Sequence, residues 1–334
     1  MTTRVNPPST IYDVATMAGV SISTVSLALN SPNRVKPATL SRVLAAIDEL
    51  GFVPKSEAVT RARRGIGRIG VIAPFTTYAS FARRLNGVLR AVRAHSCEVV
   101  VYDQESAASS QLATLPLTRR LDGLIVMSLP FSDEIAERLA DQNIDTVLVE
   151  VVRDGFSSVT IDDTAGGRMV ADLLVARGHE RFAFIGEEQR SHHYLSLSEA
   201  RLSGFREALA AQGRLLPEAN VRTTSHNLEA AERAAGDLLD LPEPPTAIFA
   251  HDDLLASAAL KVARQRSLSV PGDLAVVGFD DSDIAQHLGL TSVRQPLEES
   301  GALATDTLLA QMADHGRPRQ HISLELTLVE RDTT

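Results

Sequence analysis

The chain has 334 residues, 44% of them hydrophobic, so it is long and apolar enough for two or three domains with cores of their own. Its single cysteine, Cys97, excludes a disulfide framework and a cysteine-based zinc site. The sequence contains no basic-then-apolar leader and no apolar run of membrane length. We therefore expect a cytoplasmic protein, and nothing in the composition points to a metal or a cofactor.

The net charge of −9 is unevenly distributed along the chain. Residues 1–68 hold nine Lys/Arg against four Asp/Glu, a net charge of +5, which leaves −14 for the remaining 266 residues. Neutralisation of phosphates by Lys and Arg supplies most of the non-specific affinity for nucleic acids. The basic N-terminal segment is therefore a candidate for DNA binding, although charge alone is equally typical of a solvated tail.

The stretch "TIYDVATMAGVSISTVSLALN", residues 10–30, predicts two short helices joined by a tight turn. Thr10 is a plausible N-cap with Asp13 in the capping-box position, and Gly19 suits a left-handed exit. Ser21 is expected to cap the second helix, which buries Val25 and Ala28 or Leu29. The positions expected to face outward on this second helix are Ile22, Ser23, Ser26 and Leu27.

A third helix is predicted from Pro37 to the glycine at position 51. Its apolar stripe consists of Leu40, Val43, Leu44, Ile47 and Leu50. Two short helices joined by a glycine-containing turn form a helix-turn-helix, whose second helix can enter a major groove. The alternative is a three-helix packing unit that binds nothing.

After residue 67, short apolar runs alternate with longer segments of helical periodicity. Examples of the runs are "RIGVIAP", "EVVVYD", "LDGLIVMS", "DTVLVE", "RFAFIG", "TAIFAH" and "DLAVVGFDD". This alternation is typical of βαβ units and parallel sheets. Over about 265 residues it favours an α/β body of two doubly wound lobes, with ligand at the carboxyl ends of the strands.

Several motifs in the body carry little functional weight. The "GIGRIG" stretch at residues 65–70 matches a dinucleotide fingerprint, but it leads into a strand instead of following one. The pair His192 and His193 has no partner at metal-ligand spacing, and His179 stands just before a strand, where a structural role is favoured. No G-x-S-x-G nucleophile elbow occurs, so hydrolase chemistry has little support and we do not expect an enzyme.

Residues 10–30, followed by "RVKPATLSRVLAAIDELGFVPK" at residues 34–55, closely resemble the head of the LacI/GalR family of bacterial transcription regulators. The resemblance continues through "GRIGVIAP", "LDGLIV", "VARGHERFAFIG", "RLSGF", "VPGDLAVVGFDD" and "LTSVRQPLEESG", so it covers nearly the whole chain. It implies a three-helix DNA-binding head, a hinge segment and a two-lobed body like that of periplasmic binding proteins.

The domain boundaries expected from this resemblance place the head at 1–53, the hinge at 54–67 and the body at 68–334. Within the body, one lobe is expected to comprise 68–161 with 296–322, and the other 162–295 with 323–334. The family's four-chain members add a C-terminal heptad helix, which is absent after "ELTLVERDTT", so a homodimer is expected.

The resemblance implies that operator DNA is contacted by the head and the hinge. In the family the first outward residues of the second helix read bases, and these are Ile22 and Ser23 here, while an often basic position is Leu27. Apolar side chains can contact thymine methyl groups but cannot make the bidentate guanine contact. The full set of expected DNA-binding residues is Thr10, Ile11, Tyr12, Ser21, Ile22, Ser23, Thr24, Ser26, Leu27, Asn30, Arg34, Lys36, Thr39, Lys55, Ala58 and Arg61.

In the hinge, the position where the family wedges a leucine into the minor groove is Arg61. An arginine suits a narrow, electronegative minor groove better than it suits an apolar wedge, so we expect a preference for an A/T-rich operator centre. Simple phosphate contact is the alternative.

Effector-binding residues are also carried over by the resemblance. Arg201 occupies the arginine position of the R-x-x-G-F motif and Asp280 ends the "VGFDD" strand; together they suit a sugar-like polyol. His251 stands where many members have asparagine, which leaves the effector's identity in doubt. The expected effector set is Phe75, Tyr78, Phe81, Glu150, Arg201, His226, His251, Asp252, Asp280 and Gln295. An inter-lobe salt bridge or a helix cap is the structural alternative for Arg201, Asp280, Glu150 and Gln295.

The function expected from these features is that of a ligand-responsive DNA-binding regulator. It would be a repressor that binds a near-palindromic operator as a dimer, with a sugar or sugar-like effector between the lobes. The alternative is a sugar-binding transport protein with the same body, which the basic head argues against.

Overall fold

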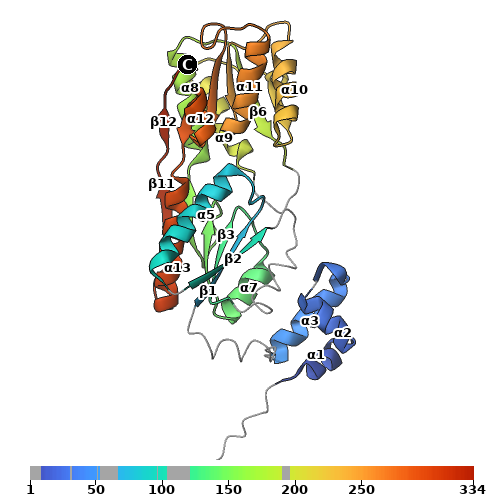
Figure 1. Ribbon diagram of the computed structural model, residues 1–334. Helices are drawn as coiled ribbons and strands as arrows, with labels where there is room; N and C mark the ends of the chain where they lie inside the picture. Colours follow the sequence, from blue (N-terminus) through green and yellow to red (C-terminus); the bar gives the residue numbers. More distant parts are fainter. Residues whose placement is uncertain are drawn as a thin grey trace, which may run out of the picture. The chain divides into compact units, whose positions relative to one another are not determined.

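The structure is a computed structural model that describes residues 9–30, 32–50, 52, 67–95, 97–103, 121–189 and 196–334 (Figure 1). The chain forms two compact units. Unit 1 contains Met1–Thr76, Val88–Ser157 and Ala302–Gln320; unit 2 contains Thr77–Gly87, Ser158–Gly301 and His321–Thr334. Residues 77–87 thus group with the second unit, whereas the sequence placed them in the first lobe. The expected hinge lies outside the described residues except for Gly67.

The N-terminal head contains the predicted three helices, which are α1 (Ile11–Ala18), α2 (Ile22–Asn30) and α3 (Pro37–Leu50), with a short η1 turn (Pro32–Arg34) before α3. The Thr10 N–H donates a hydrogen bond of 2.7 Å to the Asp13 carboxylate, which confirms the capping box. Gly19 has φ +62°, so it provides the left-handed exit from α1. The head core is formed by Val14, Val25, Ala28, Leu40, Val43, Leu44 and Ile47.

The first sheet has the strand order β11-β5-β4-β3-β1-β2. Its strands are β1 (Gly67–Ala73), β2 (Cys97–Asp103), β3 (Gly123–Met127), β4 (Asp145–Val149), β5 (Ser157–Ile161) and β11 (His321–Leu324). The helices that accompany it along the chain are α5 (Ala79–Ala91), η2 (Val92–Ala94), α7 (Asp133–Asp141) and α13 (Leu297–Ala313). The pairs β1–β2, β1–β3, β3–β4 and β5–β11 are all parallel.

The second sheet, in unit 2, has the order β12-β10-β9-β8-β6-β7, and only β12 is antiparallel to its neighbour. Its strands are β6 (Phe182–Glu187), β7 (Val221–Thr224), β8 (Ala247–Ala250), β9 (Ala275–Phe279), β10 (Thr291–Arg294) and β12 (Thr327–Val329). The strand order reverses between β6 and β8. In open α/β sheets, ligands bind outside the carboxyl ends of the strands at such a switch point.

Helices cover both faces of the second sheet because successive strand residues point to opposite faces. Ala183 and Ile185 of β6 pack against α10 (Leu228–Leu239), α11 (Asp253–Gln265) and α12 (Asp283–Leu288). Phe182 and Phe184 of the same strand pack against α8 (Asp163–Ala176) and α9 (Ser198–Ala211). The remaining short element of this unit is η3 (Glu218–Asn220). Unit 2 is therefore a three-layer α/β sandwich.

Two glycines allow α8 and α9 to approach closely. A Cβ atom on Gly204 would lie 1.9 Å from the Thr164 carbonyl oxygen, and one on Gly167 would lie 2.1 Å from the Arg201 carbonyl oxygen. Both distances are far below contact distance, so no side chain fits at either position. The glycine of "RLSGF" is thus explained by helix packing, while Phe205 after it is fully buried.

The α/β fold class with a helix-turn-helix head is confirmed. All seven apolar runs form strands, and "GIGRIG" leads into β1, as expected from the sequence. Among the described helices, none alone is long and apolar enough to cross a membrane; α1 and residues 22–29 meet that requirement only as a pair, with a bend of 102° between them.

Candidate functional site

The head exposes one face of α2. The Ser21 hydroxyl accepts a hydrogen bond of 3.2 Å from the Thr24 N–H, which confirms Ser21 as the cap of this helix. Ile22 is 40% exposed and Ser23 is exposed, whereas Ser26 and Leu27 are half-buried. The outer face of α2 therefore combines hydroxyl and aliphatic groups and carries no charge.

The other expected DNA-binding residues are spread over the head. Tyr12, Arg34 and Lys36 are exposed, while Thr10, Ile11, Thr24 and Thr39 are half-buried. The side chain of Asn30 and the hinge residues Lys55, Ala58 and Arg61 lie outside what the structure describes. The DNA-contacting role of this whole set stays a prediction.

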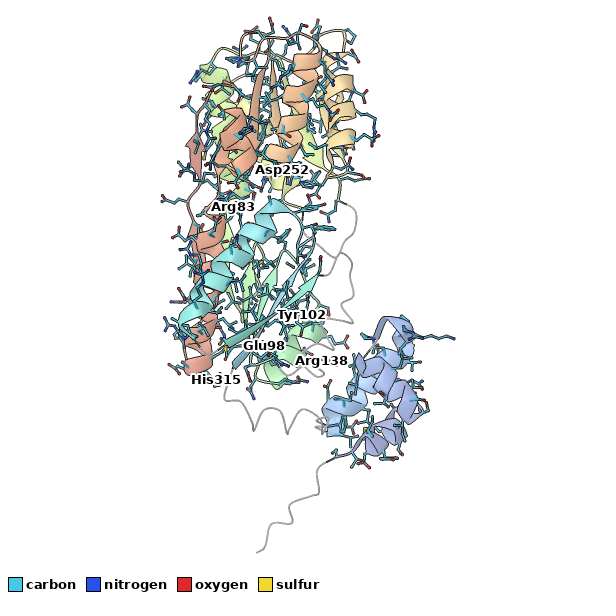
Figure 2. All side chains as sticks on the ribbon, viewed as in Figure 1. Arg83, Glu98, Tyr102, Arg138, Asp252 and His315 are labelled. Carbon is cyan, nitrogen blue, oxygen red and sulfur yellow. The ribbon has the colours of Figure 1, made fainter. Side chains whose placement is uncertain are left out.

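In unit 2, polar side chains gather at the carboxyl ends of the central strands. Glu187 is the last residue of β6, His251 and Asp252 follow β8, and Asp280 follows β9. Since parallel strands end at the same edge, residues far apart in the sequence meet there. Figure 2 labels Asp252 at this edge. All four side chains are buried, with exposed fractions of 6–8%.

Arg201 is held in place by groups of its own unit. Its Nε donates to the Asp163 carboxylate at 2.8 Å, and one terminal nitrogen donates to the His251 carbonyl oxygen. The guanidinium lies over the Phe279 ring at 3.7 Å from the centroid. Burial raises the pKa of Asp163, although the charge of Arg201 opposes this shift. Arg201 is therefore oriented by a buried ion pair within unit 2.

His226 and Asp252 form a close pair that links the N-terminal ends of α10 and α11. The His226 Nε2 contacts Asp252 Oδ2, while Oδ1 of Asp252 accepts from the Leu255 N–H at 2.9 Å and so caps α11. Burial lowers the pKa of His226, but the hydrogen bond and charge of Asp252 outweigh it and raise this pKa overall. Burial raises the pKa of Asp252, but His226 opposes it and the net pKa is about 2. The Asp252 carboxylate therefore favours the protonated form of His226.

Tyr78 packs on this pair. Its ring is stacked on His226 with centroids 4.0 Å apart, and its hydroxyl lies 3.4 Å from Glu187 Oε1. Glu187 Oε2 in turn lies 3.7 Å from His251 Nε2. The structure therefore brings Tyr78, His226, His251 and Asp252 together, as the sequence suggested, and adds Glu187.

His251 is neutral and incompletely satisfied. Burial, followed by the charge of Arg201, lowers its pKa to about 3. Its Nδ1 is buried and has no hydrogen-bond partner in the described part of the chain. A buried polar atom without a partner is costly, so such an atom in a native structure calls for an explanation.

Asp280 and Gln295 form a second polar pair. The Gln295 Nε2 donates to the Asp280 carboxylate, and the Gln295 Oε1 accepts from Arg84 at 3.1 Å. Arg83, labelled on α5 in Figure 2, donates to the Asp280 carbonyl oxygen at 3.0 Å and pairs with Glu298. Asp280 has φ +101°, a strained conformation for a residue with a side chain. Backbone strain at a strand end is common at binding sites.

Two further carboxylates, Asp253 and Asp281, hold this strained turn. Asp253 accepts 2.6 Å hydrogen bonds from the Ser282 N–H and the Ser292 hydroxyl. Burial, followed by the charge of Asp280, raises its pKa to about 8. Asp281 accepts from Arg294 and Arg331.

Asp163, Glu187 and Asp253 were not among the site residues predicted from the sequence. For Glu187 a signal existed, since it is the first charged residue after an apolar strand run. For Asp163 and Asp253 the partners are distant in sequence, and no local pattern identifies them.

Phe75 and Glu150 belong to unit 1. Each follows a strand and has positive φ, +51° for Phe75 and +65° for Glu150, and each is buried. Ser128, after β3, shares this conformation with φ +51°. Phe81 belongs to unit 2, is buried, and has Arg84 5.9 Å from its ring centroid. The strand ends of unit 1 therefore carry backbone strain similar to that at Asp280.

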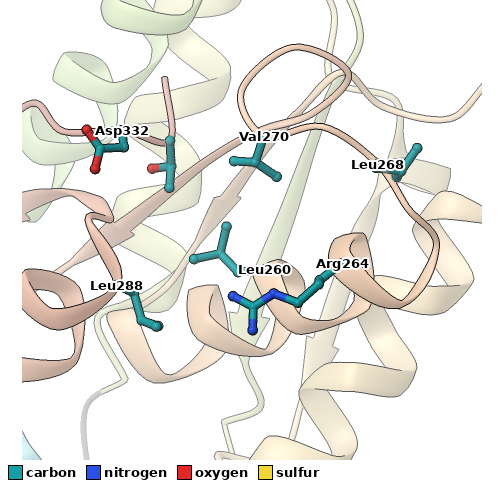
Figure 3. Close-up of a pocket in the computed structure, with 7 residues that line it drawn as sticks. Leu260, Arg264, Leu268, Val270, Leu288 and Asp332 are labelled. Atoms are coloured by element: carbon teal, nitrogen blue, oxygen red, sulfur yellow. The ribbon is translucent and has the colours of Figure 1, made fainter.

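A pocket of about 270 Å³ lies elsewhere in unit 2 (Figure 3). It is lined by Leu260, Arg264, Leu268, Val270, Leu288, Asp332 and Thr333. These residues come from α11, from the loop that leads into β9, from α12 and from the segment after β12. None of the expected effector residues lines it. His179 is also away from the polar cluster, since it precedes β6 and contacts Thr246 at 3.2 Å, in line with the structural role favoured for it.

A helix-turn-helix head on an α/β body with polar strand ends defines the class of DNA-binding regulators with a periplasmic-binding-protein-like body. Family profiles agree: that of bacterial regulatory proteins of the lacI family matches residues 10–55, and that of the periplasmic binding protein-like domain matches residues 171–334. The HTH-type transcriptional repressor CytR of Escherichia coli K12 is 32% identical over 91% of this chain and 90% of its own. The chain belongs to the LacI/GalR family and is a DNA-binding transcriptional regulator.

Other relatives support the same assignment. The transcriptional regulator CelR of Thermobifida fusca is 31% identical, covering 97% of this chain and 98% of its own. A solved CelR–cellobiose complex has a TM-score of 0.71 at 31% identity and covers 98% of this chain and 100% of its own. A Lac repressor structure with bound ONPG has a TM-score of 0.70 at 26% identity, with the same coverage. These relatives are regulators and not enzymes.

Proposed function

We propose that this regulator is a repressor that binds a near-palindromic operator as a homodimer in the cytoplasm and responds to a small hydroxylated effector, such as a sugar. The observation that carries this proposal is the cluster of buried polar groups at the strand ends of unit 2. This cluster includes Arg201 and Asp280, and hydrogen bonds within the unit hold both side chains in position. Two regulators of the same family, CelR and the Lac repressor, have been solved with cellobiose and with ONPG. The relative CytR is a repressor by name.

Effector contact is proposed for the ten residues expected from the sequence. Arg201 and Gln295 can donate to hydroxyl groups, whereas Asp280, Asp252 and Glu150 can accept from them. Tyr78 and Phe75 can offer ring faces to a sugar. We propose that the chain crosses between the two lobes beside this site, at the boundaries 161/162, 295/296 and 322/323.

DNA contact is proposed for the exposed face of α2 and for the basic residues of the head and hinge. The net charge of +5 on residues 1–68 supports this assignment. Arg61 is proposed to lie in an A/T-rich minor groove.

The homodimer is proposed from the family resemblance, and twofold dimers are the commonest soluble oligomers. Sedimentation of the full chain should give twice the mass of one chain.

Replacement of Arg201 tests the effector site. In a mobility-shift assay with an operator selected from random DNA, the wild-type chain should bind with a steep salt dependence and lose or gain affinity when an effector from a metabolite library is added. Arg201→Ala should retain operator binding and lose the effector response, because it removes the donor at the proposed site. Arg206→Ala is the matched control, since Arg206 lies on the same helix and pairs with Glu218 at the surface.

Arg201→Lys keeps the charge that neutralises Asp163, so it separates loss of the ion pair from loss of the forked donor. If both Arg201 variants fold and still respond to the effector as the wild type does, the assignment of Arg201 to the effector site is wrong. If the full chain selects no sequence from the random DNA, the proposal that it binds an operator is wrong.

A further inference from the structure

The pocket shown in Figure 3 lies at the end of unit 2 that is opposite the polar cluster. Arg264 is in the last turn of α11, whereas Asp252 caps the first turn of the same helix. A helix of 13 residues is about 20 Å long. Leu268 precedes β9, and the Asp332 N–H donates to the Gly289 carbonyl oxygen just before β10, so both lie toward the amino ends of these parallel strands. The pocket is therefore a separate site.

The interior of this pocket is aliphatic. Four half-buried side chains that pack against the core of unit 2 line it, namely Leu260, Leu268, Val270 and Leu288. The Thr333 hydroxyl is already used, because it donates to the Val276 carbonyl oxygen at 2.7 Å and accepts from the Thr291 N–H at 2.9 Å. The volume of about 270 Å³ exceeds that of an engineered cavity of about 150 Å³ that binds benzene. A small molecule with an aliphatic part therefore fits.

Two charged side chains line the same pocket, and neither has a partner among the residues that the structure describes. The Arg264 guanidinium has no described acceptor, whereas Arg266 on the same helix pairs with Asp240 at 2.7 Å. The Asp332 carboxylate has no described donor. It occupies the space beside Gly289, where a Cβ atom would lie 2.5 Å from it. A ligand with one anionic and one cationic group would pair with both.

The two charges are separated by an apolar surface. Arg264 belongs to α11 and Asp332 to the segment after β12, and Figure 3 shows them on different sides of Leu260. An α-amino acid carries both of its charges on one carbon atom, so it matches this arrangement poorly. A chain of methylene groups with one charge at each end matches it well, because the chain can also bury apolar area against the leucines.

We propose that this pocket binds a small ω-amino carboxylate. The ligand's carboxylate pairs with Arg264, its amino group pairs with Asp332, and its methylene groups contact the four aliphatic side chains. A simple carboxylate would leave Asp332 unmatched, and a simple amine would leave Arg264 unmatched. The site is independent of the polar cluster and of the effector proposed for it.

Ligand-observed NMR titration of the full-length chain tests the ligand class. The compounds are 4-aminobutanoate, 6-aminohexanoate and 8-aminooctanoate, each with the carboxylate and the amine of the same chain length, and leucine as an α-amino acid. Because one exposed ion pair changes an affinity by up to about fivefold, the best aminoalkanoate should bind about three- to fivefold more tightly than its matched carboxylate, its matched amine and leucine. The proposal is overturned if no aminoalkanoate binds, or if a matched compound binds as tightly.

Two charge variants test the two ends of the ligand. Arg264→Gln should weaken the carboxylate and the aminoalkanoate about three- to fivefold without weakening the amine, and Asp332→Asn should weaken the amine and the aminoalkanoate without weakening the carboxylate. Arg266→Gln and Glu330→Gln are matched controls, since each removes a nearby charge that has a partner of its own. A folded Arg264→Gln variant that binds the carboxylate as tightly as the wild type overturns the assignment.

A third variant tests the location. Leu268→Trp places a larger side chain in the pocket and should weaken all the compounds at least about tenfold. If a folded Leu268→Trp variant binds them as the wild type does, they bind elsewhere and the proposal is wrong. If this variant instead lowers the mass of the full chain in sedimentation, a second copy of the chain covers the pocket, which also overturns the small-molecule site.

Discussion

At the scale of single residues, the proposed effector site contains carboxylates with different partners. Asp163 faces Arg201, Asp252 faces His226, and Asp281 accepts from Arg294 and Arg331. Asp253 instead accepts from a backbone N–H and a hydroxyl, which favour its ionised form, but burial and then the charge of Asp280 outweigh them and favour the protonated form. This carboxyl holds the turn on which Asp280 stands.

The protonation of Asp253 should make stability fall as the pH rises. Its pKa is about 8 in the folded state against 3.8 ordinarily, so the folded state binds more protons than the unfolded state between these values. The stabilisation is complete below pH 4 and is lost as the pH rises through about 8. In the wild type the free energy of unfolding should fall by up to about 1.4 kcal/mol per pH unit. Asp253→Asn resembles the protonated form, so this variant should not show the fall.

The measurement is the free energy of unfolding of both chains from pH 5.5 to pH 8.5. Asp283→Asn, which removes an exposed carboxylate from α12, is the control. Parallel curves for the wild type and Asp253→Asn would show that Asp253 is ionised throughout and that the turn is held in another way.

Some residues of the polar cluster were predicted from the sequence and others were not, for a physical reason. Arg201, Asp280 and Asp252 lie in strongly patterned segments, directly on or after elements that local periodicity predicts. Asp253 acquires its role from Ser282 and Ser292, which are 29 and 39 residues away. A local pattern cannot predict such a partner, because the contact exists only after β8, β9 and β10 have paired.

At the scale of elements, the helices of the head follow from local signals. Caps, a glycine exit and apolar spacing were sufficient for α1, α2 and α3. The edge strands β7, β11 and β12 were not predicted, because their sequences "VRTT", "HISL" and "TLV" are short and partly polar. Their pairing depends on the sheet that is already present, which a sequence window does not contain.

The contact between α8 and α9 depends on glycine, so Gly204→Ala should be destabilising. The added methyl group would overlap the Thr164 carbonyl, and backbone cannot move aside as a side chain can. We expect a loss of about 1–3 kcal/mol in the free energy of unfolding, together with weaker effector binding, because Arg201 on α9 and Asp163 on α8 would be displaced.

Gly236→Ala on α10 is the matched control. A methyl group there would meet only the end of the Arg266 side chain at 3.5 Å, so this variant should be neutral or slightly stabilising. Thermal and denaturant unfolding measure both. Equal stability of the two variants would show that the α8–α9 spacing is not limited by Gly204.

At the scale of the whole molecule, the net charge changes sign along the chain where the α/β body begins. Residues 1–68 carry a net charge of +5 and end at the start of β1, whereas the remaining 266 residues, which form the α/β body, carry −14. An acidic surface repels the phosphate backbone, so the body should contribute little to DNA affinity of its own.

A fragment comprising residues 67–334 should therefore fold, bind the effector and lack operator affinity. The two sheets with their helices lie entirely within it. Calorimetric titration and a mobility-shift assay at low salt measure the two activities, with the full chain as the control. If this fragment bound the operator as tightly as the full chain does, the head would not be the part that recognises DNA.

The stack between Tyr78 and His226 gives the molecule a built-in optical signal. The sequence has four tyrosines and no tryptophan, so its intrinsic fluorescence comes from tyrosine alone. A phenol ring stacked 4.0 Å from an imidazole is expected to be a dim emitter. An effector that separates the two rings would brighten Tyr78, and a single tryptophan introduced at position 226 would emit against a dark background. Effector capture could then be followed in real time without a label or DNA.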